Sequence, residues 1–339
     1  MSPPGNRCKM MTSETDFNAP AHPGHDPIPL RFSPVDGKWL LKIFADLPIA
    51  KVEKAADGSG NTEAGYYRLT LADGRLLFAK VKSGERATRE HKAAELSSQL
   101  NRLGAATLAA ERTEVRQEDG LSLFLYPWIE PAFYDESLKG LANMGEALAL
   151  LHSRMRNLPQ PNATRKHLVD IWEDRLRLAH NADHAEDYLR LLSGAGDALA
   201  RTTSQIAHND IHRGNVIFEG SEVVAFIDFE DAVETRSSPL VDIAASLERF
   251  CLSPTPSEVK VRALLAGYAS ASDGTYETSA SEIIQVGLCR CYHALTVLEL
   301  SKAPENPAWL DERKKFSALL DKWPLWREII RSALHGLRI

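Results

Sequence analysis

Hydrophobic positions in the first part of the chain change between helical and strand spacing. A helix is predicted from Pro34 to Leu47, because apolar residues recur there at helical intervals, namely Trp39, Leu40, Ile43, Phe44 and Leu47. Strands are predicted at Lys51–Lys54, Tyr66–Leu71 and Leu76–Val81, and the Asp-Gly turn at Ala72–Arg75 favours a hairpin between the last two. This part of the chain therefore reads mainly as an antiparallel sheet.

The pattern then becomes mostly helical. A helix is predicted at Ala87–Leu103, followed by a strand that starts at Leu121 and runs into a proline-marked extended connector ending at Pro131. Strong amphipathic spacing predicts a helix from Leu138 to Leu151, after which His152 reads as a buried structural histidine. Later, the runs at 216–218 and 223–227 predict a second hairpin, and the chain after Ser257 is mostly helical by pattern.

A sheet-rich part followed by a helix-rich part predicts an α+β fold with two lobes. The expected bounds are 28–126 for a small lobe that binds nucleotide and 127–339 for a large lobe with the catalytic and substrate-binding residues. Residues 1–27 are rich in proline, glycine, serine and asparagine, so we expect a disordered tail there.

Composition narrows the function classes. The 339 residues carry a formal net charge of −6, and the sequence pI is about 6.0, which argues against a nucleic-acid-binding surface. No run approaches the ~20 apolar residues of a membrane span, and the first residues lack the apolar core of a signal peptide. Four cysteines in this length make no disulfide framework, so a reducing cytoplasmic location is expected.

The candidate chemistry lies on both sides of the second hairpin. His208-x-Asp210-x₄-Asn215 precedes its first strand, and Asp228 ends its second. Phosphoryl transfer needs a carboxylate that accepts the proton of the attacking hydroxyl, which suits Asp210. It also needs oxygen ligands for Mg²⁺, which suits Asn215 and Asp228.

Each of these elements has a simpler interpretation when taken alone. A His-x-Asp pair is common, and an aspartate after a strand is usually a turn former. The hairpin, however, brings the loop before its first strand beside the loop after its second. Asn215 and Asp228 are therefore expected at the same end, as a shared metal ion requires.

Small residues in the first sheet are candidates for contacts with phosphate. Gly58, Ser59 and Gly60 lie between two predicted strands, where the absence of a Cβ at the glycines lets backbone N–H groups approach phosphate oxygens. An ordinary hairpin loop is the alternative interpretation. Strand alternation places Phe78, Lys80 and Lys82 together on one face.

These motifs resemble the aminoglycoside phosphotransferase and choline kinase family, the small-molecule relatives of protein kinases. Protein kinases have Arg after the loop histidine, Lys two residues after the loop aspartate, and Gly after the metal-binding Asp-Phe. This chain has Asn209, His212 and Glu230 at those places, which points to the small-molecule branch. The run SPLVDIAASL also resembles the aminoglycoside phosphotransferases, in which its aspartate, Asp242, begins a helix and supports the catalytic loop.

The resemblance implies a bilobal protein-kinase-like fold with ATP and Mg²⁺ between the lobes. Lys80, or alternatively Lys82, would grip the α- and β-phosphates, and a helix glutamate would pair with that lysine. Glu90 is preferred for this pairing, with Glu95 left open.

The resemblance also implies contacts for the nucleotide and the reacting groups. Phe78 would lie against adenine, and backbone groups from Tyr126 to Trp128 would bind its edge. His208 would fix the backbone of the catalytic loop, while His212 would contact the transferred group or the acceptor hydroxyl.

A small-molecule hydroxyl is the expected acceptor. Only a short connector separates Asp228 from Asp242, which leaves no long platform for a peptide substrate. Glu230 and Asp231 lie just after the metal ligand and are candidates to face a cationic acceptor, whereas a turn cap at Asp231 and a solvated helix face are the alternative interpretations. Aminoglycosides, amino alcohols and sugars remain open, as does choline or ethanolamine specifically. A catalytically silent nucleotide-binding module is disfavoured, because Lys80, Asp210, Asn215 and Asp228 are all present.

Overall fold

The computed structural model describes most of the chain. The described residues are 31–56, 63–116, 120–130, 137–158, 166–167, 205–253, 255–273, 279–287, 321–322, 324–335 and 337. The predicted disordered tail at 1–27 lies outside these residues.

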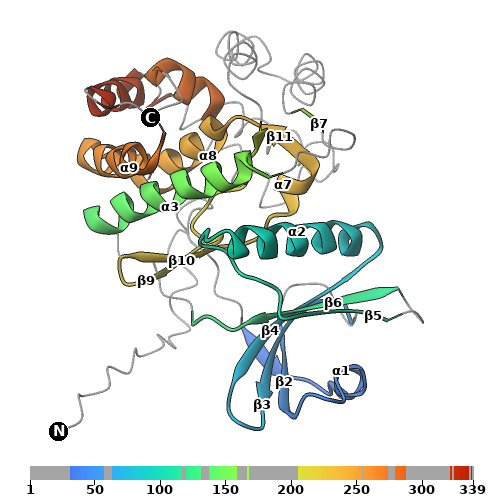
Figure 1. Ribbon diagram of the computed structural model, residues 1–339. Helices are drawn as coiled ribbons and strands as arrows, with labels where there is room; N and C mark the ends of the chain where they lie inside the picture. Colours follow the sequence, from blue (N-terminus) through green and yellow to red (C-terminus); the bar gives the residue numbers. More distant parts are fainter. Residues whose placement is uncertain are drawn as a thin grey trace, which may run out of the picture.

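The small lobe is built on a six-stranded antiparallel sheet with strand order β1-β2-β3-β4-β6-β5 (Figure 1). Its elements are β1 (Phe32–Pro34), α1 (Lys38–Ile43), β2 (Ile49–Ala55), β3 (Gly65–Leu71), β4 (Leu76–Ser83), α2 (Gly84–Arg102), β5 (Arg112–Arg116) and β6 (Leu121–Pro127). The predicted hairpin between β3 and β4 is present, and Gly74 in its turn has a φ of 88°. Such a positive φ is where glycine has an advantage over other residues.

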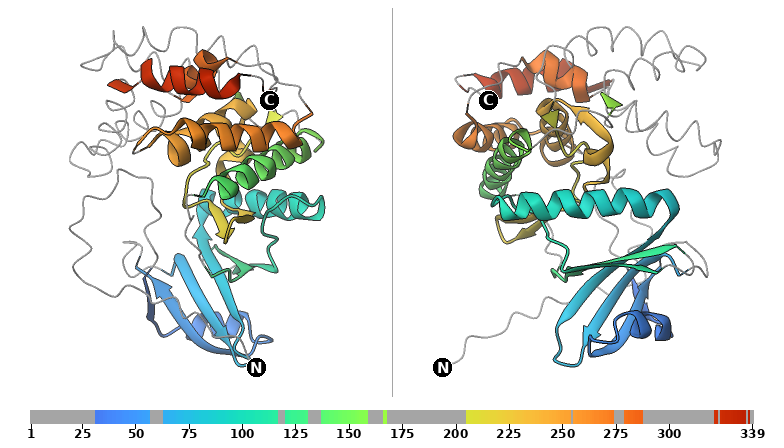
Figure 2. Two further views of the ribbon diagram at one scale, coloured as in Figure 1. Left: turned by 90° about the vertical axis from the view of Figure 1, so that its left-hand side faces the viewer. Right: turned by 45° about the vertical axis from the view of Figure 1, so that its right-hand side comes forward.

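Side chains on β4 divide between the two faces of the sheet, as predicted. Leu77, Ala79 and Val81 are buried in the sheet core beside α1, whereas Phe78 and Lys80 are half-buried on the opposite face. This opposite face is the one covered by α2, which lies between the sheet and the helical lobe in all views (Figure 2). The two candidate nucleotide contacts therefore point into the space between the lobes.

The sequence pattern was wrong at two places in this lobe. The helix expected from Pro34 to Leu47 is only six residues long, because β1 pairs with β2 up to Pro34 and the chain turns before Lys38. Strand β5 was not predicted. It forms the edge of the sheet and its sequence, RTEVR, carries charges in place of the apolar alternation that predicts strands.

The large lobe is mainly helical. It contains α3 (Leu138–Arg156), the hairpin β9 (Val216–Glu219) and β10 (Glu222–Phe226), α7 (Glu230–Glu234), α8 (Pro239–Ser246), the π-helix η2 (Leu247–Leu252) and α9 (Glu258–Ala271). A small sheet joins β7 (Lys166–His167), β11 (Thr235–Ser237) and β8 (Gln205–Ile206). Residues 280–287 and 324–334 are also helical.

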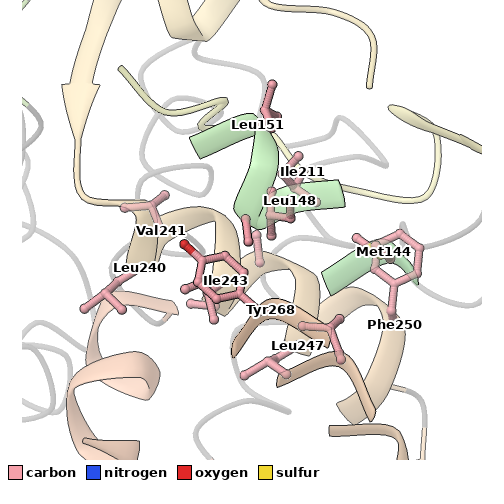
Figure 3. Close-up of a cluster of buried hydrophobic side chains, with 14 of the residues drawn as sticks. Met144, Leu148, Leu151, Ile211, Leu240, Val241, Ile243, Leu247, Phe250 and Tyr268 are labelled. Carbon is pink, nitrogen blue, oxygen red and sulfur yellow. The ribbon is translucent and has the colours of Figure 1, made fainter. Parts of the chain in front are cut away.

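Helices α3 and α9 form the centre of this lobe. They approach closely at two glycines, since a Cβ on Gly145 would lie 2.1 Å from the Leu264 carbonyl oxygen and one on Gly267 would lie 1.9 Å from that of Ala142. Apolar side chains from α3, α8, η2 and α9 converge around this contact, together with Ile211 from the loop before β9 (Figure 3). That loop is therefore attached directly to the core.

The bilobal α+β fold predicted from the sequence is thus present, while the exact lobe bounds of 28–126 and 127–339 stay predictions. No described helix combines the length and the apolar character that crossing a bilayer would need.

Candidate active site between the lobes

The loop from Ala207 to Asp210 is fixed by one buried carboxylate. Asp242 lies in the first turn of α8 and is fully buried. Its oxygens accept hydrogen bonds from the backbone N–H groups of His208 and Asn209 at 2.7 and 2.8 Å, and one of them lies 2.9 Å from Nε2 of His152. Burial alone would raise the pKa of Asp242, but the hydrogen bond from His152 and the charges and N–H groups around it hold the pKa below its ordinary range.

His208 connects this loop to the strand that carries Asp228. Its Nδ1 accepts the backbone N–H of Asp210 at 3.3 Å, so its Nε2 carries the proton and donates to the Ile227 carbonyl at 2.8 Å. The ring also packs against Phe229, with ring centroids 4.7 Å apart. His208 thereby links the backbone on either side of the site.

Asn209 has a φ of 68°, a left-handed conformation that asparagine tolerates better than most residues. Its side-chain Nδ2 donates to the carbonyls of Ala207 and Thr235 at 3.2 and 3.0 Å. The Ser237 hydroxyl donates to the Asn209 side-chain oxygen. The Asn209 side chain therefore links the loop to β11. The sequence alone did not reveal this role.

Asp210, His212 and Asn215 come together at the end of the β9–β10 hairpin. Nδ2 of Asn215 donates to the Asp210 carbonyl at 3.0 Å and to its carboxylate at 3.2 Å. Nδ1 of His212 accepts the Gly214 N–H at 3.0 Å, which leaves its Nε2 facing the Asp210 carboxylate at 3.5 Å. The Asp210 side chain is 38% exposed and so remains accessible to a hydroxyl group from solution.

The hairpin places Asn215 beside the segment that ends in Asp228. The Ile227 N–H donates to the Asn215 carbonyl at 3.0 Å, and Asp228 follows with a φ of 67°. Because Nδ2 of Asn215 is engaged by Asp210, its side-chain oxygen is the atom left to bind a cation. Asn215 is buried and the Asp228 side chain is partly exposed, and one amide oxygen with one carboxylate are hard ligands of the kind Mg²⁺ uses in nucleotide sites.

From the small lobe, Lys80 reaches this cluster. Its Nζ lies 3.1 Å from the Glu90 carboxylate of α2 and 3.5 Å from that of Asp228. Burial would lower the pKa of Lys80, but the Glu90 and Asp228 carboxylates outweigh that effect and raise the pKa. Of the two glutamates left open by the sequence, Glu95 lies on the exposed side of α2 beside His91 at 3.2 Å, so Glu90 is the partner of Lys80.

The Tyr126 side chain is a contact that sequence reasoning missed. Its hydroxyl donates to Glu90 at 3.0 Å, so the glutamate is held from two sides. Only the backbone of Tyr126 was expected to matter, and strand alternation could have shown that its ring faces the same side as Lys80. A cavity of about 50 Å³ lies between these groups and is lined by residues including Phe78, Lys80, Tyr126 and Asp228.

Aromatic side chains surround Phe78 on the same face of the sheet. Tyr66 stacks with Phe78 at 5.8 Å between ring centroids, and Trp128 lies 6.3 Å away on the other side. Of the expected backbone contacts, Pro127 has no N–H and the Trp128 N–H already donates to the Leu76 carbonyl at 3.3 Å. The predicted phosphate-binding residues Gly58, Ser59 and Gly60 lie outside the described residues.

The acidic residues of α7 do not lie free for a cationic acceptor, which corrects the sequence-based expectation. Asp231 forms an ion pair with Arg89 of α2, and Glu230 lies 3.7 Å from both Lys82 and Arg89. Burial raises the pKa of both carboxyls. Lys82, the alternative to Lys80, therefore faces Glu230 and not Glu90.

A sheet lobe and a helical lobe, with these side chains gathered where they meet, form the arrangement of the kinase-like phosphotransferases. A family model described as the phosphotransferase enzyme family matches residues 54–273. This match covers more than half of the chain, which therefore belongs to the phosphotransferase enzyme family. A search of curated protein sequences finds no match to the chain.

Solved structures of the same fold are distant in sequence. An amicoumacin kinase, hAmiN, in complex with AMP-PNP, Ca²⁺ and Ami is 17% identical, covers 85% of this chain and 93% of its own, and has a TM-score of 0.61. Spectinomycin phosphotransferase APH(9)-Ia in complex with ADP and spectinomycin is 14% identical, covers 89% of this chain and 99% of its own, and also has a TM-score of 0.61. The choline kinase LicA from Streptococcus pneumoniae is 16% identical over 84% and 98%, with a TM-score of 0.59.

Proposed function

We propose that this protein transfers the γ-phosphoryl group of ATP, with Mg²⁺, to a hydroxyl group of a small molecule. The observation that carries the proposal is the contact of Lys80 with both Glu90 and Asp228, which joins the small lobe to the candidate metal ligand. A lysine paired with a helix glutamate is required for phosphate positioning in kinase folds. Membership of the phosphotransferase enzyme family supports the same reaction class.

Residues of the large lobe supply the proton acceptor and the metal ligands. Asp210 accepts the proton of the acceptor hydroxyl, and Asn215 orients that carboxylate through its 3.2 Å hydrogen bond. His212, whose Nε2 faces Asp210, contacts the transferred group or the hydroxyl. Asn215 and Asp228 would hold Mg²⁺, which supplies charge neutralisation at the phosphate oxygens when bound.

On the nucleotide side, Lys80 grips the α- and β-phosphates and Phe78 presents its face to the base. Tyr66 and Trp128 on either side of Phe78 extend this aromatic surface. Because Pro127 has no N–H and that of Trp128 is engaged, the base edge is bound through a carbonyl of this segment or through the next residues of the connector.

A small acceptor fits the chain between Asp228 and Asp242. This connector folds at once into α7 and β11 and then enters α8 at Pro239, so it offers no extended platform for a peptide. The aminoglycoside, amino alcohol and sugar classes remain the candidates. A choline or ethanolamine kinase is the more specific alternative, favoured by the run Ile-Asp-Phe-Glu at 227–230.

The test is a screen of hydroxyl-bearing metabolites, read as ADP release above background ATP hydrolysis. Amino alcohols, aminoglycosides and sugars are supplied singly, with Mg²⁺ and with EDTA, to the purified full-length protein. We expect ADP release that depends on one acceptor class and on Mg²⁺. Equal or faster phosphorylation of generic protein substrates would contradict a small-molecule acceptor.

Nucleotide binding is tested separately by thermal shift. At about 100 times its Kd, Mg²⁺–ATP should stabilise the fold by ~2.7 kcal/mol, and less without the metal. Absence of stabilisation at millimolar nucleotide would contradict the proposed function independently of the acceptor.

A further inference from the structure

Helix α2 contacts the segment around Asp228 through a residue that the proposed chemistry does not use. That residue is Arg89, which directly precedes Glu90. Helix α2 lies beside α7 across the border between the lobes (Figure 1). Its Nε donates to the Glu230 carbonyl at 3.3 Å, and its Nη2 donates to the carboxylate of Asp231. Nε also lies 3.3 Å from the Glu234 carboxylate. One guanidinium therefore holds both ends of this short helix.

Helix α2 is also attached, through the loop that follows it, to the chain on the N-terminal side of Asp228. In the loop after α2, the Ala106 carbonyl accepts the Phe226 N–H at 2.7 Å, and Thr107 forms an isolated bridge with Phe226. The Ser97 carbonyl of α2 accepts the Thr107 hydroxyl at 2.8 Å, which fixes that loop to the helix. Phe226 and Glu230 stand two residues before and two residues after Asp228. The attachments to α2 thus bracket the candidate metal ligand.

Bracketing matters because the backbone of Asp228 has a φ of 67°, a left-handed conformation that aspartate tolerates better than most residues but that still costs free energy without support from its surroundings. Such a conformation persists where the surroundings impose it. On the N-terminal side the strand pairing and His208 supply this restraint. On the C-terminal side, α7 is only five residues long and Phe229 makes no side-chain cap. Ala232 and Val233 pack into the core of the large lobe, and Arg89 attaches the acidic residues of α7 to α2.

We propose that Arg89 is a positioning residue that clamps α7 onto α2 and thereby holds Asp228 in its metal-binding conformation. The inference rests on the proposed function for the role of Asp228, and on geometry alone for the clamp. Arginine suits the task, because its planar fork donates to a carbonyl and to carboxylates in one fixed geometry, which a lysine ammonium does not.

The first test measures the clamp without nucleotide. Arg89→Ala is compared with Arg86→Ala, which removes an exposed arginine one turn earlier that forms no hydrogen bond or ion pair with the described residues of α7. Backbone hydrogen exchange at residues 230–234 should rise roughly three- to tenfold in Arg89→Ala, since exposed ion pairs contribute little individually but act here together. The control should leave exchange there unchanged.

The second test measures the consequence for metal binding. Arg89→Ala should raise the Mg²⁺ concentration needed for half-maximal nucleotide binding by about tenfold, with metal-free nucleotide affinity and Tm close to those of the wild type. Arg89→Lys should recover only part of the loss. The pair Asp231→Asn with Glu234→Gln removes two of the carboxylates that contact Arg89 and leaves its bond to the Glu230 carbonyl. It should raise the Mg²⁺ requirement in the same direction by a smaller factor, and it replaces Arg89→Ala as the test if that variant fails to fold.

The two tests separate the clamp from the function. Unchanged exchange in α7 for Arg89→Ala and for the α7 double variant overturns the clamp. Faster exchange with an unchanged Mg²⁺ requirement overturns the positioning of Asp228. If the wild type shows no Mg²⁺-dependent nucleotide binding, the proposed function fails, whereas the exchange data still decide whether Arg89 holds α7.

Discussion

The two halves of the site are held in different ways. In the large lobe, His208, Asn209 and Asp242 use buried hydrogen bonds to backbone groups, and all their partners except His152 lie between residues 205 and 246. In the small lobe, Lys80 and Glu90 are held by contacts between side chains, one of which joins residues 148 positions apart. The first half is built by local folding, whereas the contact between Lys80 and Asp228 in the second half exists only when the lobes are together.

Because of this difference, the contacts in the large lobe should govern the stability of the fold, and the contacts of Lys80 should govern how the two lobes are aligned. Buried backbone contacts preorganise Asp210 and Asn215 whatever the nucleotide does, so changes there should alter the chemistry or the fold outright. Ionic side-chain contacts between the lobes set how Lys80, the proposed phosphate contact, meets Asp228, the proposed metal ligand. Changes on that side should alter nucleotide handling with smaller effects on folding.

The largest effect is expected from Asp210→Asn. The variant cannot accept a proton, and a positioned general base contributes roughly 10²–10⁴-fold to the rate. Initial rates with the acceptor found by the screen should fall by that factor, while circular dichroism and Mg²⁺–ATP binding stay as in the wild type. A variant with the parental rate would make Asp210 a structural residue.

Asp242→Asn should affect folding most strongly. Removing the charge of a buried carboxylate that serves His208, Asn209 and His152 costs about 3 kcal/mol. Because the pKa of Asp242 is lowered in the folded state, its contribution is present above the unfolded pKa of ~3.9 and is lost as pH falls through the folded value.

The measurement is urea unfolding at several pH values. The difference between the wild type and Asp242→Asn should be full at pH 7 and should shrink below about pH 4. Asp36→Asn, at an exposed carboxylate, is the control for general charge effects. A difference that is the same at all pH values would show that the variant acts through packing and not through the charge.

The sequence predicts which residues come together in the large lobe better than in the small lobe, because the contacts in the large lobe are local in the chain. Asp210, Asn215 and Asp228 are close in the chain and joined by one hairpin, so spacing alone brings them together. The partner of Lys80 was left open between Glu90 and Glu95, because both lie on one helix and only the packing of α2 selects the buried one. Arg89 went unnoticed, since nothing in the local sequence shows that α7 will lie opposite.

The same reasoning explains why the expected direction of the acidic residues in α7 was wrong. Glu230 and Asp231 follow the metal ligand, and adjacency in sequence suggested that they face the acceptor. Their direction depends on how α2 of the small lobe packs on α7, where Arg89 meets them. The edge strand β5 was missed in a similar way, because its pairing with β6 and not its own composition makes it a strand.

Glu90→Gln tests the small-lobe half. It removes one of the two carboxylates that contact Lys80, and hydrogen bonds to charged groups are worth ~1.5–3 kcal/mol, so kcat/KM for ATP should fall roughly 10- to 100-fold. Glu95→Gln on the exposed side of the same helix is the matched control and should change little. Equal losses in the two variants would show that helix charge, and not the Lys80 contact, is responsible.

Tyr126→Phe should have the smallest effect and gives the sharpest comparison. Burial and the nearby Glu90 raise the pKa of Tyr126, so its hydroxyl stays protonated and donates to Glu90. Losing this bond, which a neutral hydroxyl donates to a charged carboxylate, should cost ~1.5 kcal/mol, at the lower end of the range for such bonds, seen as a drop of about tenfold in kcat/KM for ATP. If the hydroxyl acts only by holding Glu90 for Lys80, Tyr126→Phe should cost almost nothing further in a Glu90→Gln background. Full additivity of the two changes would mean that the Tyr126 hydroxyl acts independently of Glu90.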